Sequence, residues 1–266
     1  MRFIDDGWRT GAENMARDEA LAIAAGEHPS EPTLRLYRFR PACVTIGRFQ
    51  DYPAGLEVAA CGELGIDVVR RPTGGLAILH LDDFTYSATF SGEFHSGLTK
   101  DRVFSAVGEG ILASLRILGV QVALAAHHGG TARSSPWCFE SAFGVDLEWL
   151  GRKICGSAQK QSSRCILQHG SIFLESTEGV LRTITGSPAA GPPGGVRAGR
   201  LVCMSEAAGR TVCWEELREA FVEGFEITLG EKLDNGDLTP LEEGIAGGLL
   251  DEKYGTRRWL ERPAGG

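Results

Sequence analysis

The chain has 266 residues, 42% of them hydrophobic and 23% charged, which is typical of a globular protein large enough to bury a sizeable core. No apolar run is long enough to span a membrane, and residues 1–6 lack the apolar segment of a signal peptide, so we expect a cytoplasmic protein without a membrane partner. The formal net charge of −8 and the lack of a basic stripe argue against nucleic-acid binding.

The first 90 residues predict a mixture of strands and short helices. Residues 14–25 carry apolar side chains at helical spacing, with Asn14 in position to cap the helix. Residues 53–64 are expected to form a short helix with its proline in the first turn. Strands are expected at residues 34–36, 43–48 and 84–90. The last of these alternates aromatic or apolar residues with hydroxyl residues, which predicts a strand that is buried on one face only.

The middle of the chain contains the clearest helix and a predicted reversal. Residues 101–118 place a continuous row of apolar side chains on one face, and Gly119 is a suitable end for the helix. Residues 143–149 alternate in the manner of a strand. Gly151 and Gly156 follow that stretch and predict a tight reversal between them.

The last third of the chain is predicted to be a loop followed by helices. Residues 186–200 are rich in glycine and proline and cannot hold regular structure. Apolar periodicity predicts helices at 214–229 and 240–254, the second capped by Thr239.

The order of these elements predicts the fold class. Because several strands follow one another closely in sequence, we expect hairpins more than parallel crossovers. The prediction is an α+β fold with a mixed, largely antiparallel sheet and packed helices. We expect residues 1–266 to form one catalytic domain, in which 186–200 is a loop and 201–266 is a helical C-terminal part.

Seven cysteines are present, and no two of them have the C-x2-C spacing of a zinc site. An odd number of cysteines in a protein expected in the cytoplasm predicts free thiols. The adjacent pair His127 and His128 is too small a set of ligands for a metal centre. We therefore expect no bound metal.

Residues 137–175 carry the least ordinary chemistry. Cys138 follows a loop-like stretch and is a candidate nucleophile, although most lone cysteines are buried and inert. Cys155 and Cys165 are rival nucleophiles, but both fall in strand-like runs where burial is expected. Lys153 precedes the small residues 156–158, whose backbone another group can approach closely.

A second distinctive stretch is Arg70-Arg71-Pro72-Thr73-Gly74-Gly75. Backbone N–H groups of such a turn, with a flanking arginine, suit a phosphate or an acyl carbonyl. Taken alone, the stretch is more often a plain turn, and it matches neither the P-loop nor the dinucleotide-binding fingerprint. His80 and His169 are, taken alone, more often structural residues than bases.

Taken together, these segments resemble a known family. The resemblance rests on Asn14-Met15-Ala16-x-Asp18-Glu19-Ala20, Arg70 to Gly75, Gly151-Arg152-Lys153-Ile154-x-Gly156-Ser157-Ala158-Gln159 and His169-Gly170-Ser171. In this order they resemble the lipoate ligase and octanoyltransferase family, which has the biotin/lipoate protein ligase catalytic fold. Trp137-Cys138-Phe139, placed before the lysine motif, is similar to the transferases that act on the glycine-cleavage H protein.

The resemblance implies an acyltransferase without a cofactor. Its donor would be octanoyl-acyl carrier protein, and its acceptor a lysine of a lipoyl domain or of the glycine-cleavage H protein. By resemblance, Cys138 is the acyl-accepting nucleophile and Lys153 the active-site lysine. The implied substrate-binding residues are Arg71, Thr73, Gly74, Gly75, His80, Gly156, Ser157, Ala158, His169 and Gly170.

Three other functions remain open at this point. An ATP-dependent lipoate ligase shares most of the motifs, but such ligases usually have a third glycine where this chain has Leu76. An amidotransferase that moves octanoate between lipoyl domains is a close relative of the transferases. A non-catalytic acyl-carrier-binding protein is the alternative from another class, and the presence of both Cys138 and Lys153 argues against it.

Overall fold

The computed structural model describes residues 1–92, 97, 99–124, 147–186 and 201–263. Its main sheet has eight strands, in the order β11 (Asp234–Asn235), β1 (Arg2–Arg9), β2 (Thr33–Phe39), β6 (Asp83–Ser91), β10 (Cys165–Phe173), β9 (Arg152–Gln161), β8 (Leu147–Trp149) and β7 (Ala123–Leu124). β1 runs parallel to β2 and β11, and every other neighbouring pair is antiparallel. A smaller sheet has the order β4 (Asp67–Arg70), β3 (Cys43–Ile46), β5 (Ile78–His80).

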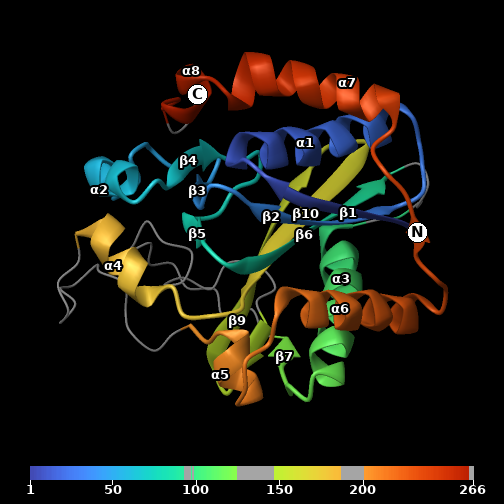
Figure 1. Cartoon of the computed structure of the whole chain (residues 1–266). Coiled ribbons are helices and arrows are strands. Elements are labelled where there is room, and N and C mark those ends of the chain that lie inside the picture. Colours follow the sequence, from blue (N-terminus) through green and yellow to red (C-terminus); the bar gives the residue numbers. More distant parts are fainter. Residues whose placement is uncertain (93–96, 98, 125–146, 187–200, 264–266) are drawn as a thin grey trace.

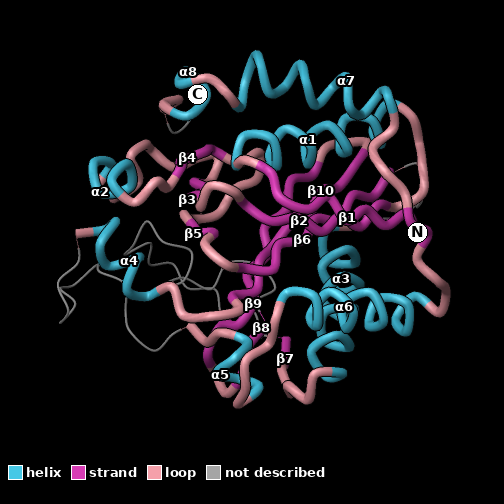
Figure 2. Tube along the Cα trace, in the orientation of Figure 1, coloured by secondary structure: helices cyan, strands magenta, loops and turns pink. Residues whose placement is uncertain are grey.

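Helices cover both faces of the main sheet (Figure 1). One face carries α1 (Gly11–Glu27) and, outside it, α7 (Pro240–Leu249), which continues into the π-helix η2 (Leu250–Tyr254) and α8 (Arg257–Leu260). The other face carries α3 (Lys100–Ile117) and α6 (Trp214–Leu229). The short helices are α2 (Val58–Glu63), α4 (Glu178–Thr185) and α5 (Met204–Ala208), and α2 and α4 lie beside the small sheet (Figure 2). The predicted α+β fold is confirmed. None of the helices in the described ranges is long and apolar enough to cross a membrane.

The predicted helices α3, α6 and α7 are confirmed with boundaries close to those expected. Thr239 caps α7 in a reciprocal arrangement, in which its hydroxyl accepts from Glu242 N and its own N–H donates to the Glu242 carboxylate. The assignment of Asn14 as a cap is wrong, because Thr10 caps α1 with the same pattern and Asn14 is fully buried inside the helix. The Asn14 amide instead donates to Arg38 O at 2.9 Å.

The predicted helix over 53–64 begins later, at Val58. Ala54 and Gly55 have φ angles of 58° and 75°, and residues in this left-handed region cannot belong to a right-handed helix. The predicted loop over 186–200 falls outside the described residues apart from Gly186, which ends α4 with φ 61°.

β6 is the strand for which the predicted burial is wrong. Phe84, Tyr86 and Ala88 pack into the core under α3 and α6, as their alternation predicts. The opposite set, Thr85, Ser87 and Thr89, is also buried, at 1–3% exposure. α1 covers that face, and Ser87 Oγ donates to Asp18 of α1 at 2.7 Å. The hydroxyls of β6 therefore lie in a buried polar layer between sheet and helix.

The reversal predicted between Gly151 and Gly156 lies earlier, as a two-residue turn at Leu150 and Gly151, whose φ angles are 51° and 76°, and residues 152–155 belong to β9. Gly156, which was expected to bound the reversal, lies inside β9. The pairing of β9 with β8 contains an irregularity: Leu147 pairs with Cys155 and Glu148 with Lys153, so Ile154 is an extra residue. β9 thus has a β-bulge at Ile154.

Candidate active site

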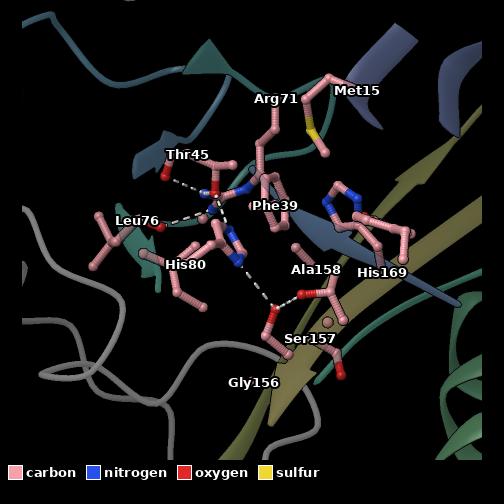
Figure 3. A pocket seen from close by; sticks show the side chains of 16 residues that line it. Met15, Phe39, Thr45, Arg71, Leu76, His80, Gly156, Ser157, Ala158 and His169 are labelled. Atoms are coloured by element: carbon pink, nitrogen blue, oxygen red, sulfur yellow. Dashed lines mark hydrogen bonds between the residues drawn. The ribbon is translucent and has the colours of Figure 1, made fainter. Parts of the chain in front are cut away.

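A pocket lies between the two sheets, under α1 (Figure 3). The empty space inside it, counted together with the open solvent at its mouth, is about 560 Å³. Its deep end is lined by buried side chains such as Met15, Tyr37 and Phe39, which are 1–3% exposed. Its mouth is lined by partly or fully exposed residues, namely Gly75, Leu76 and the segment 156–158. The depth and apolar lining suit a hydrocarbon chain.

Glycines form the narrow parts of this pocket. A Cβ atom on Gly170 would lie 2.5 Å from Gly156 O and 2.8 Å from the Tyr86 hydroxyl, so β9 and β10 can approach here only without a side chain. Gly75 has φ 91°, and a Cβ there would lie 2.6 Å from Nη2 of Arg71. Both glycines were candidates from the sequence, and the structure places both at the pocket.

Arg71 holds the turn that forms one wall of the pocket. Its guanidinium donates to the carbonyl oxygens of Thr45, Gly74 and Leu76 at distances from 2.8 to 3.1 Å. Arg71 is 5% exposed and lines the pocket, while Gly74 contributes through its carbonyl and does not line it. The sequence favoured a plain turn or an anion-binding turn. In the structure, the hydrogen bonds of Arg71 go largely to the turn itself.

His169 and Asp18 form a buried pair at the deep end. His169 Nδ1 donates to Asp18 Oδ2 at 2.9 Å, and His169 Nε2 lies 2.6 Å from the hydroxyl of Thr73. Burial raises the pKa of Asp18, but the hydrogen bond from His169 and the charge of Arg35 outweigh it and hold that pKa below its usual value. Burial lowers the pKa of His169, against the opposite effect of Asp18. A neutral imidazole beside an ionised carboxylate is the resulting state at neutral pH.

His80 forms a second pair of the same kind. Its Nδ1 lies 2.7 Å from Asp83 Oδ2, and its Nε2 lies 3.0 Å from the hydroxyl of Thr45. The ring stacks on Phe39 with the centroids 4.0 Å apart. His80 lines the pocket and is 4% exposed. Both histidines are therefore fixed at two ring nitrogens.

Lys153 does not line the pocket, yet the bulge places it on the pocket side of β9. Ile154 and Cys155 are consecutive residues and both belong to the core under α3 and α6. Strict alternation would put them on opposite faces, so the bulge has shifted the phase by one residue. Lys153 consequently shares a face with Gly156 and Ala158. It is 8% exposed and lies about 10 Å along the strand from Gly156.

Cys138, with Trp137 and Phe139, lies outside the described residues, so its expected role as a nucleophile stays a prediction. The rival Cys155 is buried at 1% exposure. Cys165 is buried as well, and burial raises the pKa of its thiol. Neither of these buried thiols is suited to act as a nucleophilic thiolate. In the described ranges no cluster of three His, Cys, Asp or Glu residues is arranged to hold a metal ion.

Sequence reasoning missed several residues that organise the site. Asp18 was quoted as part of a motif without a role, and it accepts hydrogen bonds from His169, Arg35, Tyr37 and Ser87. Its signal was available, since an acidic residue on the apolar face of a predicted helix requires buried partners. Thr45 and Asp83 had no comparable signal in the sequence.

Known proteins resemble this chain over nearly its whole length. Residues 10–226 match the lipoyl protein ligase A/B catalytic domain family. Octanoyltransferase LipM of Symbiobacterium thermophilum is 38% identical over 98% of each chain, and octanoyltransferase LipM of Bacillus subtilis is 32% identical over 97% of this chain and 96% of the relative.

Solved structures share the fold. A putative lipoate protein ligase from T. acidophilum with bound lipoic acid has a TM-score of 0.80 at 24% identity, and each chain is covered to 98%. A lipoate-protein ligase A bound with ATP has a TM-score of 0.81 at the same identity and coverage. The family match and the near full-length relatives agree with the motifs read from the sequence. The chain therefore belongs to the lipoyl protein ligase A/B catalytic domain family.

Proposed function

We propose that this protein is an octanoyltransferase of lipoate biosynthesis, which carries an octanoyl group from octanoyl-acyl carrier protein to a lysine of a lipoyl domain. The near full-length identity with proteins named octanoyltransferase carries the proposal. The deep apolar pocket with an open mouth at 156–158 supports it, because an acyl chain can enter there with its carbonyl left near β9.

The proposed reaction has two acyl transfers with Cys138 as the intermediate carrier. The Cys138 thiolate bonds to the donor's carbonyl carbon, and the bond from that carbon to the carrier's sulfur breaks. The carrier leaves as a thiolate and takes up the proton that Cys138 lost. A free cysteine has a pKa of ~8.5, so only a few per cent is thiolate near neutrality. A cationic Lys153 near the thiol would lower that pKa by roughly one to three units.

In the second transfer the acceptor lysine attacks the acyl-enzyme. A C–N bond forms, the bond to the sulfur of Cys138 breaks, and the proton that the amine loses goes to the departing Cys138 thiolate. From a pKa of ~10.4, keeping the attacking amine neutral at pH 7 costs about 4.6 kcal/mol. The glycine-cleavage H protein is the acceptor we propose, since the order of Trp137-Cys138-Phe139 and the lysine motif resembles the transferases that act on it.

Acylation in the absence of nucleotide tests this function against a ligase. A thioester donor is already activated, whereas a ligase that starts from free acid must first form an adenylate. We would incubate octanoyl-carrier protein with the parent, Cys138→Ala, Cys155→Ala and Cys165→Ala, without ATP, and locate the acyl group by peptide mass spectrometry. We expect a label on Cys138 that only Cys138→Ala abolishes. A label that requires ATP and free octanoate would indicate a ligase, and a label that persists in Cys138→Ala would move the nucleophile elsewhere.

A further inference from the structure

Two chains of buried hydrogen bonds start at Arg71, and the first runs through Thr73. Arg71 Nε donates to Thr73 Oγ1 at 3.2 Å. Thr73 Oγ1 lies 2.6 Å from His169 Nε2, and His169 Nδ1 lies 2.9 Å from Asp18 Oδ2. This chain joins the pocket turn to β10 and then to α1. Each of its four members is at most 6% exposed.

The second chain runs through Thr45 and has the same order of groups. Arg71 Nη1 donates to Thr45 Oγ1 at 3.4 Å, in addition to its bond to Thr45 O at 3.0 Å. Thr45 Oγ1 lies 3.0 Å from His80 Nε2, and His80 Nδ1 lies 2.7 Å from Asp83 Oδ2. This chain joins the same turn to the small sheet and to β6. We name the two Thr–His–Asp chains the Arg71 clamp.

The ends of each chain determine the direction of the first and the last hydrogen bond in it. A guanidinium only donates, and a carboxylate only accepts. Each threonine hydroxyl therefore accepts from Arg71, and each histidine donates from Nδ1 to its carboxylate. Burial lowers the pKa of His169 and keeps its ring neutral, so its Nε2 has no proton and accepts from the Thr73 hydroxyl. Neither ring presents a free basic nitrogen to the pocket.

We propose that His80 and His169 are positioning residues that hold the Gly75–Leu76 wall of the acyl pocket through Arg71. The proposal rests on the octanoyltransferase function, because it assigns to that wall the binding of the octanoyl chain. Arg71 reaches the wall through its bonds to Gly74 O and Leu76 O, both 2.8 Å long. When a chain is broken, Arg71 Nε and Nη1 keep their bonds to Gly74 O and Thr45 O. The guanidinium loses a side-chain acceptor that fixes its orientation, and the remaining members of the broken chain lose a buried hydrogen bond, so the hold of Arg71 on the wall weakens.

A general-base role and a positioning role for His169 predict different results for the Thr73→Val variant. Removing the Thr73 hydroxyl frees the Nε2 lone pair, so a base would keep its rate or gain from the change. A positioning role predicts that Thr73→Val behaves like His169→Gln, because both break the same chain. The two roles also differ in the kinetic constant they change: a base acts on kcat, and a pocket wall acts on KM.

The test compares steady-state kinetics of Thr73→Val, His169→Gln, the double variant and the rescue variant Thr73→Ser, with octanoyl- and hexanoyl-carrier protein as donors. The control is Thr89→Val, since Thr89 Oγ1 is buried on β6 and has no hydrogen-bond partner among the described residues. We expect each single variant to raise KM for the octanoyl donor by about fivefold to a hundredfold, the range for one lost buried hydrogen bond. Thr73→Ser and the control should match the parent.

The double variant of Thr73→Val and His169→Gln should have a KM no higher than that of the single variant with the higher KM, because both changes break the same chain of hydrogen bonds. Thr45→Val, in the second chain, should reproduce the KM effect, and it keeps the proposal testable if His169→Gln does not fold. Thr73→Val with parental KM, or a loss in His169→Gln confined to kcat, would overturn the proposal.

Calorimetric binding of octanoate separates this proposal from the proposed function. If the parent binds octanoate but transfers none, the proposed transferase function is refuted. The octanoate binding constants of the parent and the variants would still test whether the Arg71 clamp holds the pocket wall. Weaker octanoate binding in Thr73→Val, restored in Thr73→Ser, is the expected result. Unchanged octanoate binding in all clamp variants would refute the clamp whatever the parent transfers.

Discussion

The buried carboxylate of Glu19 allows a quantitative prediction about the stability of the protein. It lies on α1 at 5% exposure and accepts hydrogen bonds from Lys160 Nζ at 2.6 Å, from Tyr254 at 2.7 Å and from Lys253. Burial raises the pKa of Glu19, but the bonds and charges of Lys160 and Lys253 outweigh it and lower the pKa from 4.5 to about 2. The carboxylate thus joins α1 to the end of β9 and to η2.

The size of this shift converts into stability. A difference of about 2.5 pKa units corresponds to about 3 kcal/mol of unfolding free energy. Because the pKa of the folded state is the lower one, this contribution is complete above pH 4.5 and is lost as the pH falls towards 2. Glu19→Gln should therefore lower the unfolding free energy by about 3 kcal/mol at pH 7, and the gap to the parent should close at acid pH.

Urea unfolding of the parent and Glu19→Gln at pH 7, 5, 4 and 3 measures the gap directly. Glu216→Gln is the matched control, since Glu216 pairs with Arg210 at the surface and such pairs contribute little. We expect a large gap for Glu19→Gln and a small one for the control at pH 7. A gap that is the same at every pH would refute the reasoning, because it would then come from packing and not from the charge.

Three further predictions concern the pocket. Lys153→Met should remove most octanoyl transfer and leave the thermal midpoint close to that of the parent, since an unbranched apolar side chain of similar size keeps the packing of a residue that is 8% exposed. A parental kcat would exclude a catalytic lysine. Gly170→Ala should lower the unfolding free energy, measured in urea, by about 1–3 kcal/mol, because its Cβ would overlap Gly156 O. An unchanged unfolding free energy would mean that β9 can move away from the new methyl group without cost. A hexanoyl donor should react about fifteenfold more slowly in kcat/KM than an octanoyl donor, from two methylenes at ~0.8 kcal/mol each, and equal rates would exclude a buried acyl chain.

Local sequence signals predicted the helices well, because their information lies within one or two turns. α3 and α6 have apolar side chains at helical spacing, and their ends fall within one residue of the predicted ones. The start of α1 was misplaced for an equally local reason. Asn14 is a good capping residue, but Thr10 and Glu13 cap the helix reciprocally, four residues before Asn14.

The buried polar layer could not be predicted from local signals, because its partners are far apart in the chain. Asp18 and His169 are separated by 151 positions, and Thr73 and His169 by 96. Alternation along β6 indicated a strand, but a hydroxyl face reads the same whether water or a helix covers it. The candidate residues at the pocket came from the order of several motifs, which carries the long-range information that no single motif contains.

The bulge in β9 could have been predicted from the sequence alone. Strict alternation through Lys153, Cys155 and Ser157 puts the lysine on the face that holds Cys155 in the core. Burying a lysine ammonium in that apolar core is costly. One extra residue resolves the conflict, since it keeps Ile154 and Cys155 in the core and turns Lys153 to the side of Gly156 and Ala158. A charged residue out of phase in an apolar strand is thus itself evidence for a bulge, and the bulge is what brings this lysine to the pocket side of the sheet.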